Sequence, residues 1–141
     1  METPAKTTIT VETIINAPIE KVWECWTKPE HIVQWNNASD DWYTPTATND
    51  LRVGGTFHAR MEAKDGSVGF DFIGTYEAVQ HHEYIEYALA DGRNVSINFT
   101  ADGDSTRIVE KFGAEDTNPV EMQQAGWQAI LDNFKKHVEK E

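Results

Sequence analysis

Alternating apolar and polar residues, separated by Asp-Gly pairs, run through the middle of the chain from Leu51 to Phe112. A period of two is typical of strands with one buried face. An Asp-Gly pair favours the positive φ angles of a tight hairpin turn. The sequence therefore predicts an antiparallel meander with strands at Thr56 to Ala63, Gly69 to Gln80, Glu83 to Ala90, Val95 to Thr100 and Thr106 to Phe112.

One further strand and three helices are predicted on either side of this meander. Thr8 to Glu12 alternates as a strand does. Pro18 suits the first turn of a helix, and Pro29 both ends that helix and begins a second one. A long amphipathic helix follows Asn118, which we expect to be its N-cap. The segment from Asn36 to Asp50 carries no periodic pattern and is expected to be a loop.

The alternation assigns one face of the sheet to large apolar and aromatic side chains, which would point toward the C-terminal helix. Gly126 lies in the middle of that helix, where glycine is unfavourable, so we expect another group to approach its backbone closely. The inner face is interpreted as a ligand pocket, with a filled aromatic core as the alternative. The candidate ligand-binding residues are Phe57, Met61, Phe70, Phe72, Tyr76, Tyr87, Ile97, Phe99, Glu110, Trp127, Ile130 and Phe134.

Glu110 is the one acidic residue among these candidates. If Ile108 and Phe112 face inward, Glu110 must do so as well, because side chains two residues apart in a strand share a face. A buried carboxyl group is unfavourable unless paired, and such groups gather at functional sites. Glu110 could orient a ligand hydroxyl or act in acid-base chemistry, whereas a twisted strand would instead carry it to solvent or to a basic partner.

The charge balance excludes several partners. The chain has 12 Lys plus Arg against 24 Asp plus Glu, which gives a formal net charge of −12. Nucleic acid and anionic membranes are bound through excess positive charge, so neither is expected. Neither a membrane-spanning stretch nor a signal peptide is recognised, and the lone Cys25 forms no internal disulfide. We expect a cytoplasmic protein without membrane insertion or cofactor.

The sequence predicts no metal site. The adjacent His81 and His82 would point to opposite sides of a strand, so a turn is the better interpretation. His31 and His137 lie far apart on different helices and are expected at the surface. Cys25 has no histidine nearby in the local pattern to activate it, so no catalytic role is expected for it.

Five short stretches, taken in order, resemble one family. They are Ala17 to Trp23, Trp26 to Glu30 with Trp35, Asp50 to Phe57, Gly74 to Tyr76, and Gly126-Trp127. On these motifs the chain resembles the activator of heat-shock-protein-ninety ATPase homologue-like (AHSA-type) family, in the START and birch-pollen-allergen-like (SRPBCC) superfamily. The resemblance implies an α+β helix-grip fold, with a curved antiparallel sheet of about seven strands around a long C-terminal helix and two short helices after the first strand.

The resemblance also implies a cavity that in many relatives holds an apolar small molecule or lipid, but it implies no reaction. We expect one helix-grip domain over residues 1–141, with residues 1–6 loosely ordered. The leading interpretation is non-enzymatic binding of an apolar or aromatic, lipid-like small molecule in that cavity. One alternative is a polyketide-cyclase-like enzyme that uses Glu110 or a tyrosine as its acid or base.

Another alternative is a stress-linked, co-chaperone-like interaction module with an exposed apolar patch around Trp42 and Tyr43. That alternative would need a chaperone partner, which no feature of the sequence supports.

Overall fold

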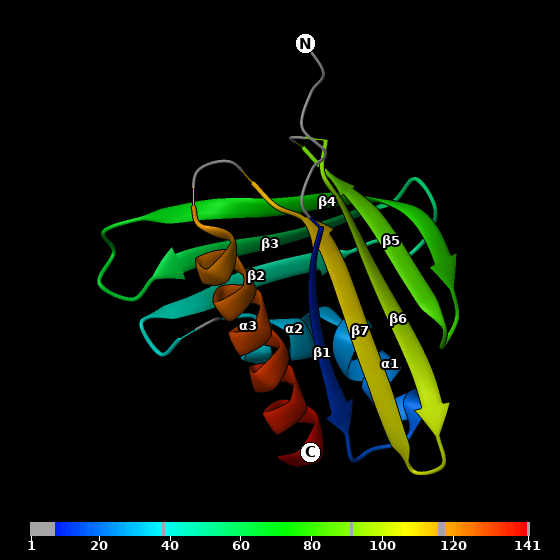
Figure 1. The fold of residues 1–141 in the computed structure, drawn as a ribbon. Coiled ribbons are helices and arrows are strands. Elements are labelled where there is room, and N and C mark those ends of the chain that lie inside the picture. The colour runs from blue at the N-terminus through cyan, green and yellow to red at the C-terminus, as the bar shows by residue number, and fades with distance from the viewer. Residues whose placement is uncertain (1–7, 38, 91, 116–117, 141) are drawn as a thin grey trace.

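The computed structural model describes residues 8–37, 39–90, 92–115 and 118–140 (Figure 1). The first six residues, expected to be loosely ordered, lie outside the described part. Within it the chain forms one antiparallel sheet in the order β1-β7-β6-β5-β4-β3-β2. The strands are β1 (Thr8–Ile15), β2 (Trp42–Asn49), β3 (Thr56–Ala63), β4 (Gly69–Gln80), β5 (Tyr84–Leu89), β6 (Asn94–Asp102) and β7 (Ser105–Gly113).

Helices α1 (Ile19–Thr27) and α2 (Pro29–Trp35) follow β1, and α3 (Val120–Lys140) follows β7. The sheet curls strongly, so that β2 to β4 run nearly across the direction of β5 to β7 (Figure 1). Helix α3 lies along β1 at one edge of the sheet. Side chains of Gln124, Gln128 and Lys135 on α3 donate hydrogen bonds to carbonyl oxygens of β1. These bonds satisfy backbone groups that an edge strand would otherwise leave without a partner.

Prolines mark the starts of α1 and α2, but Pro18 is the N-cap of α1 with an extended backbone and is not part of its first turn. The carbonyl oxygen of Pro18 accepts the first backbone hydrogen bond of α1 from the amide of Val22, at 3.1 Å. Pro29 occupies the first turn of α2, where backbone amides have no acceptor within the helix, so the lack of an amide hydrogen costs no hydrogen bond. The hairpin glycines are confirmed as well, since Gly66 and Gly103 have φ angles of +77° and +62°. The meander therefore turns where the Asp-Gly pairs predict.

Two local expectations are wrong. The segment predicted as a loop contains β2, an edge strand whose pairing with β3 is irregular between Tyr43 and Thr46, on either side of Pro45. Proline is tolerated there because an edge strand leaves backbone positions outside the ladder. Asn118 is not the N-cap of α3, since the first amide bonds of the helix go to the carbonyl of Pro119 and the side chain of Asn118 donates to Glu115.

The hydrophobic core fills the space between α1, α2, the C-terminal half of α3 and the sheet. Phe134 from α3 packs edge-on against Trp26 and Trp35, with ring centroids 4.9 and 4.8 Å apart. Phe99 from β6 packs in the same way against Trp23 at 5.1 Å. Phe99 and Phe134 thus fill the space beside Trp23, Trp26 and Trp35. Among the described residues, no helix is long and apolar enough to cross a membrane.

Candidate functional site

A cavity of about 350 Å³ lies between the curled sheet and the N-terminal half of α3. Strands β3, β4, β5 and β7 form one wall, and α1, α2 and α3 form the other. Its lining is mostly aromatic and apolar, and the predicted residues that contribute to it are Phe57, Met61, Phe70, Phe72, Tyr76, Tyr87, Glu110, Trp127 and Ile130.

The remaining three candidates lie in the filled core. Ile97, Phe99 and Phe134 are at most 4% exposed and do not line the cavity. Ile97 and Phe99 face inward, as the alternation predicts. Trp23 packs against Phe99, and Trp26 packs against Phe134. Inward orientation was therefore predictable from the period of two, whereas the presence of empty space in front of a side chain was not.

Sequence reasoning missed several lining residues. Helical periodicity marked some of them only as core residues, and the polar ones lie where no periodic signal exists, in loops or at the start of α3. The lining residues outside the candidate set are Trp26, Ile32, Trp35, Asn36, Ile85, Arg93, Glu115, Asn118, Met122, Gln123, Gly126 and Leu131.

Gly126 faces the open cavity. A Cβ atom built at this position would meet no atom within 4 Å, outside its chain neighbours and the backbone of its own helix. The close approach expected at this backbone is therefore not made by any described residue of the chain. Glycine instead leaves room in the middle of α3 at the wall of the cavity, and a larger side chain would project into that space.

Glu110 points inward and is 6% exposed. In the ladder it lies between Val11 on β1 and Ile97 on β6, both of them buried. Within the described residues its carboxyl group has no hydrogen-bonding partner. Every polar side-chain atom there that is fully enclosed by protein does have one. The carboxyl oxygens therefore reach the cavity surface. Burial raises the pKa of Glu110 to about 8, so the group is mostly protonated at neutral pH.

Two tyrosines line the same cavity as this carboxyl group. The hydroxyl of Tyr76 donates a hydrogen bond of 2.5 Å to Asn49 Oδ1 and is thereby occupied. Tyr87 is 7% exposed, and its hydroxyl makes no hydrogen bond within the described part of the chain. Burial, and then the nearby Glu110, raise the pKa of Tyr87 well above its ordinary value. The cavity thus holds two neutral hydroxyl donors, from a carboxylic acid and a phenol.

Aromatic rings fix the shape of the cavity. Trp127 stacks on Phe112 with centroids 3.8 Å apart, which holds its indole in place at the wall. Phe72 meets Trp127 and Tyr87 edge-on, at 6.1 and 6.3 Å. Edge-to-face contacts of this kind are favourable, so the wall is preorganised. Two lining residues, Met122 and Phe70, are 61% and 45% exposed and mark the mouth of the cavity.

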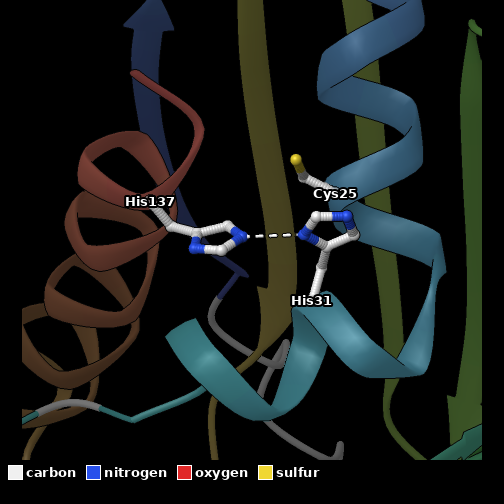
Figure 2. Close-up of side chains that lie close together, drawn as sticks. All are labelled: Cys25, His31 and His137. Carbon is white, nitrogen blue, oxygen red and sulfur yellow. Dashed lines mark hydrogen bonds between the residues drawn. The ribbon is translucent and has the colours of Figure 1, made fainter. Parts of the chain in front are cut away.

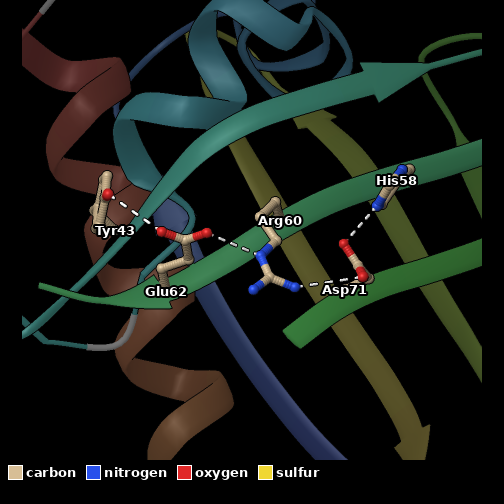
Figure 3. Close-up of polar contacts among 5 residues, drawn as sticks. All are labelled: Tyr43, His58, Arg60, Glu62 and Asp71. Atoms are coloured by element: carbon tan, nitrogen blue, oxygen red, sulfur yellow. Dashed lines mark hydrogen bonds and ion pairs between the residues drawn. The ribbon is translucent and has the colours of Figure 1, made fainter. Parts of the chain in front are cut away.

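The outer face of β2, β3 and β4 carries a chain of polar contacts (Figure 3). His58 Nε2 lies 2.9 Å from Asp71 Oδ1, and Arg60 bridges Asp71 to Glu62. The hydrogen bond from His58 lowers the pKa of Asp71. Exposed ion pairs of this kind contribute little stability because water screens them. This network is a solvated face, as the alternation predicts.

The aromatic pair proposed for partner binding is only half exposed. Tyr43 is 41% exposed and its hydroxyl contacts Glu62. Trp42 is partly buried, and its ring meets Phe70 edge-on at 5.8 Å. The two residues therefore do not form one exposed apolar patch.

One of the two histidine pairs lies where the sequence predicts, and the other does not. His81 and His82 occupy a turn, as predicted, with their rings stacked at 3.7 Å. The expectation that His31 and His137 lie apart at the surface is wrong. His137 is 6% exposed, and its Nε2 lies 2.9 Å from Nδ1 of His31 (Figure 2). Helix packing brings together residues that are 106 positions apart, and no local pattern could have indicated it.

The curled seven-stranded sheet with a long C-terminal helix held against it defines a protein of the helix-grip class. Residues 16–139 match the family described as Activator of Hsp90 ATPase homolog 1-like protein. The match covers most of the chain, so the chain belongs to this family, within the START-like SRPBCC superfamily.

Solved structures agree with this assignment. An AHSA1-like protein from Aeromonas hydrophila is 45% identical, with a TM-score of 0.89 over 95% of this chain and 93% of that one. Chr148 from Cytophaga hutchinsonii is 54% identical, with a TM-score of 0.82 over 94% and 92%. CV1439 from Chromobacterium violaceum, at 23% identity and a TM-score of 0.83 over 94% and 96%, shares the fold. No curated protein matches the chain.

Proposed function

We propose that the chain binds a compact apolar or aromatic, lipid-like small molecule in the cavity between the sheet and α3, and that it catalyses no reaction. The observation that carries this proposal is a preformed, largely aromatic cavity of about 350 Å³ with a mouth between Met122 and Phe70. That volume is at the lower end of the range for small-molecule sites, which favours a ring system or a short chain.

Apolar burial supplies most of the expected affinity. A ligand that buries roughly 250 Å² of apolar surface would gain about 6 kcal/mol, before the costs of association are subtracted. Because Trp127 and Phe72 are already held by other rings, little side-chain ordering is needed on binding.

Glu110 and Tyr87 supply the polar recognition. Both present a hydroxyl hydrogen to the cavity at neutral pH, so they suit a ligand oxygen that accepts hydrogen bonds, such as a carbonyl or a hydroxyl. A ligand without such an oxygen would displace water from the cavity and leave both donors without a hydrogen-bond acceptor, which is unfavourable. We therefore favour an apolar molecule with one oxygen function near the centre of the sheet.

The test is a two-dimensional amide NMR titration with fatty acids, flavonoid-like aromatics and polyketide mimics. Saturable shifts on the inner strands and on the Trp127 indole are expected. Gly126→Leu should fill the cavity and abolish these shifts. Ala125→Leu adds the same side chain to an exposed neighbouring position of α3 and should leave them unchanged. A silent panel, or equal binding by both variants, would contradict the proposal.

An acid-base enzyme of the polyketide-cyclase kind is the second candidate. The raised pKa of Glu110 beside a ligand-sized cavity favours it, since a general acid works best with a pKa near the operating pH. Tyr76 is less suited to that role because Asn49 occupies its hydroxyl. Turnover of a polyketide mimic that Glu110→Gln abolishes without loss of binding would support the enzyme and overturn the non-enzymatic proposal.

The co-chaperone alternative has less support. It depended on an exposed pair at Trp42 and Tyr43, and Trp42 is packed against Phe70. We place the binding function in the cytoplasm, because the single Cys25 is buried and requires no oxidising compartment.

A further inference from the structure

We propose that Cys25, His31 and His137 form a binding site for a divalent ion of the Zn²⁺ class. This site is separate from the cavity and does not depend on the proposed function. It brings together one thiol and two imidazoles from three different helices (Figure 2).

The geometry of the three groups carries the proposal. One sulfur or nitrogen atom from each residue lies within 4.8 Å of the other two. Nδ1 of His31 and Nε2 of His137 face each other at 2.9 Å. Cys25 and His137 are 2% and 6% exposed, so two of the three donors are removed from competing water. Three donors that could ligate a metal have thus been gathered at one buried point.

The donor set selects the class of ion. Thiolate sulfur and imidazole nitrogen suit Zn²⁺ and Co²⁺, whereas Ca²⁺ and Mg²⁺ require oxygen ligands. In a tetrahedral Zn²⁺ site, with bonds of about 2.0 to 2.3 Å, donor atoms lie roughly 3.3 to 3.6 Å apart. The two rings need to separate by only a few tenths of an ångström, and the sulfur, which lies within 4.8 Å of both nitrogens, has to move inward by at most about 1 Å. Side-chain rotation achieves both.

The protons on the three side chains can rearrange to allow an ion to bind. In the hydrogen bond between His31 and His137, one of the two facing nitrogens carries the hydrogen. A bound ion would replace that hydrogen bond and contact both facing nitrogens, so that the ring carrying the hydrogen changes tautomer and holds it on its outer nitrogen. The thiol of Cys25 loses its proton to solvent and binds as thiolate. Water completes the coordination on the side of the half-buried His31.

The protein holds the three helices in place without the ion. Lys28 alone separates α1 from α2, which fixes Cys25 and His31 on adjoining helices. Helix α3 is tied to the end of α2 by the hydrogen bond from Asn133 Nδ2 to the carbonyl of Asn37, at 2.6 Å. Phe134 packs on Trp35 one turn before His137. The ion would therefore enter a preorganised site and require little rearrangement.

The experiment uses the whole chain, freed of any affinity tag and treated with a chelator. Calorimetric titration with Zn²⁺ should give one ion per chain. Co²⁺ should give a thiolate charge-transfer band in the near ultraviolet, which Cys25→Ser abolishes. Removing one nitrogen ligand with His31→Gln should weaken binding roughly tenfold or more. His58→Gln is the matched control, because His58 lies on the outer face of β3.

A bound ion should also stabilise the fold. At a free Zn²⁺ concentration of about 100 times the Kd, the equilibrium constant for folding should rise about 100-fold, and in His31→Gln this increase should be smaller by about tenfold or more. The half-buried His31 can be changed without opening the core, so the test stands even if Cys25→Ser folds poorly.

Three results would each overturn the metal site. They are the absence of a charge-transfer band with the unmodified chain, equal Zn²⁺ affinity of His31→Gln and the unmodified chain, and equal weakening by His58→Gln. Repeating the small-molecule NMR titration with His31→Gln keeps the two proposals apart, because the cavity should still bind its ligand when the metal site is lost.

Discussion

Replacing Glu110 with glutamine should change how the stability of the protein depends on pH. Burial raises the pKa of Glu110 from 4.5 to about 8 in the folded state. The folded chain therefore holds this proton more tightly than the unfolded chain does between those two pH values. As pH rises through that window, the free energy of unfolding falls, and above about pH 8 the contribution of Glu110 becomes constant.

The size of the effect follows from the shift. Each unit of pKa difference corresponds to about 1.4 kcal/mol, so the whole window amounts to about 5 kcal/mol. At pH 7 the loss reaches about 3 kcal/mol. These are upper values, because solvent in the cavity can hydrate the ionised carboxylate. Glutamine has nearly the same shape as protonated glutamate and does not ionise, so Glu110→Gln should escape the loss.

The assay is urea unfolding of both proteins, followed by tryptophan fluorescence from pH 5 to pH 9. Subtracting the two unfolding free energies at each pH cancels the other titrating groups. The difference should be small at pH 5, should favour the Glu110→Gln variant increasingly up to about pH 8 and should then level off. Glu77→Gln, at an exposed position of β4, is the control and should show no such trend. A Glu110→Gln difference that stays constant with pH would refute the buried, protonated carboxyl group.

Three further substitutions test the packing. Gly126→Ala should stabilise the protein by about 1 kcal/mol in urea unfolding, because alanine favours a helix and the added methyl group meets open space; a loss of stability would show that the cavity wall is closed there. Gly55→Ala should destabilise by about 1 to 3 kcal/mol, since its methyl group would collide with the carbonyl oxygen of Asp50, and an unchanged Tm would contradict that contact. Phe134→Ala should destabilise by about 3 to 5 kcal/mol, because its ring fills the core between Trp26 and Trp35; a much smaller loss would argue against that packing.

The sequence alone determined the strands of the meander closely. The bounds predicted for Thr56–Ala63 and Gly69–Gln80 agree with the structure, because alternation and turn chemistry are properties of consecutive residues. The sequence also placed Glu110 on the inner face for the same reason. It missed β2, since an edge strand with a proline and few apolar residues shows no alternation to detect.

Tertiary structure alone decided where the chain leaves space and which distant groups meet. Phe72 and Phe99 carry the same inward signal, but Phe72 faces a cavity and Phe99 faces Trp23. The difference depends on how far α1, α2 and α3 lie from each part of the curled sheet, which is set by the summed volumes of side chains from all of them. Cys25 and His137 likewise meet only because three helices pack together. Strand alternation and turn positions are set by consecutive residues, whereas a cavity or a cluster of metal-donor atoms is set by the packing of the whole fold.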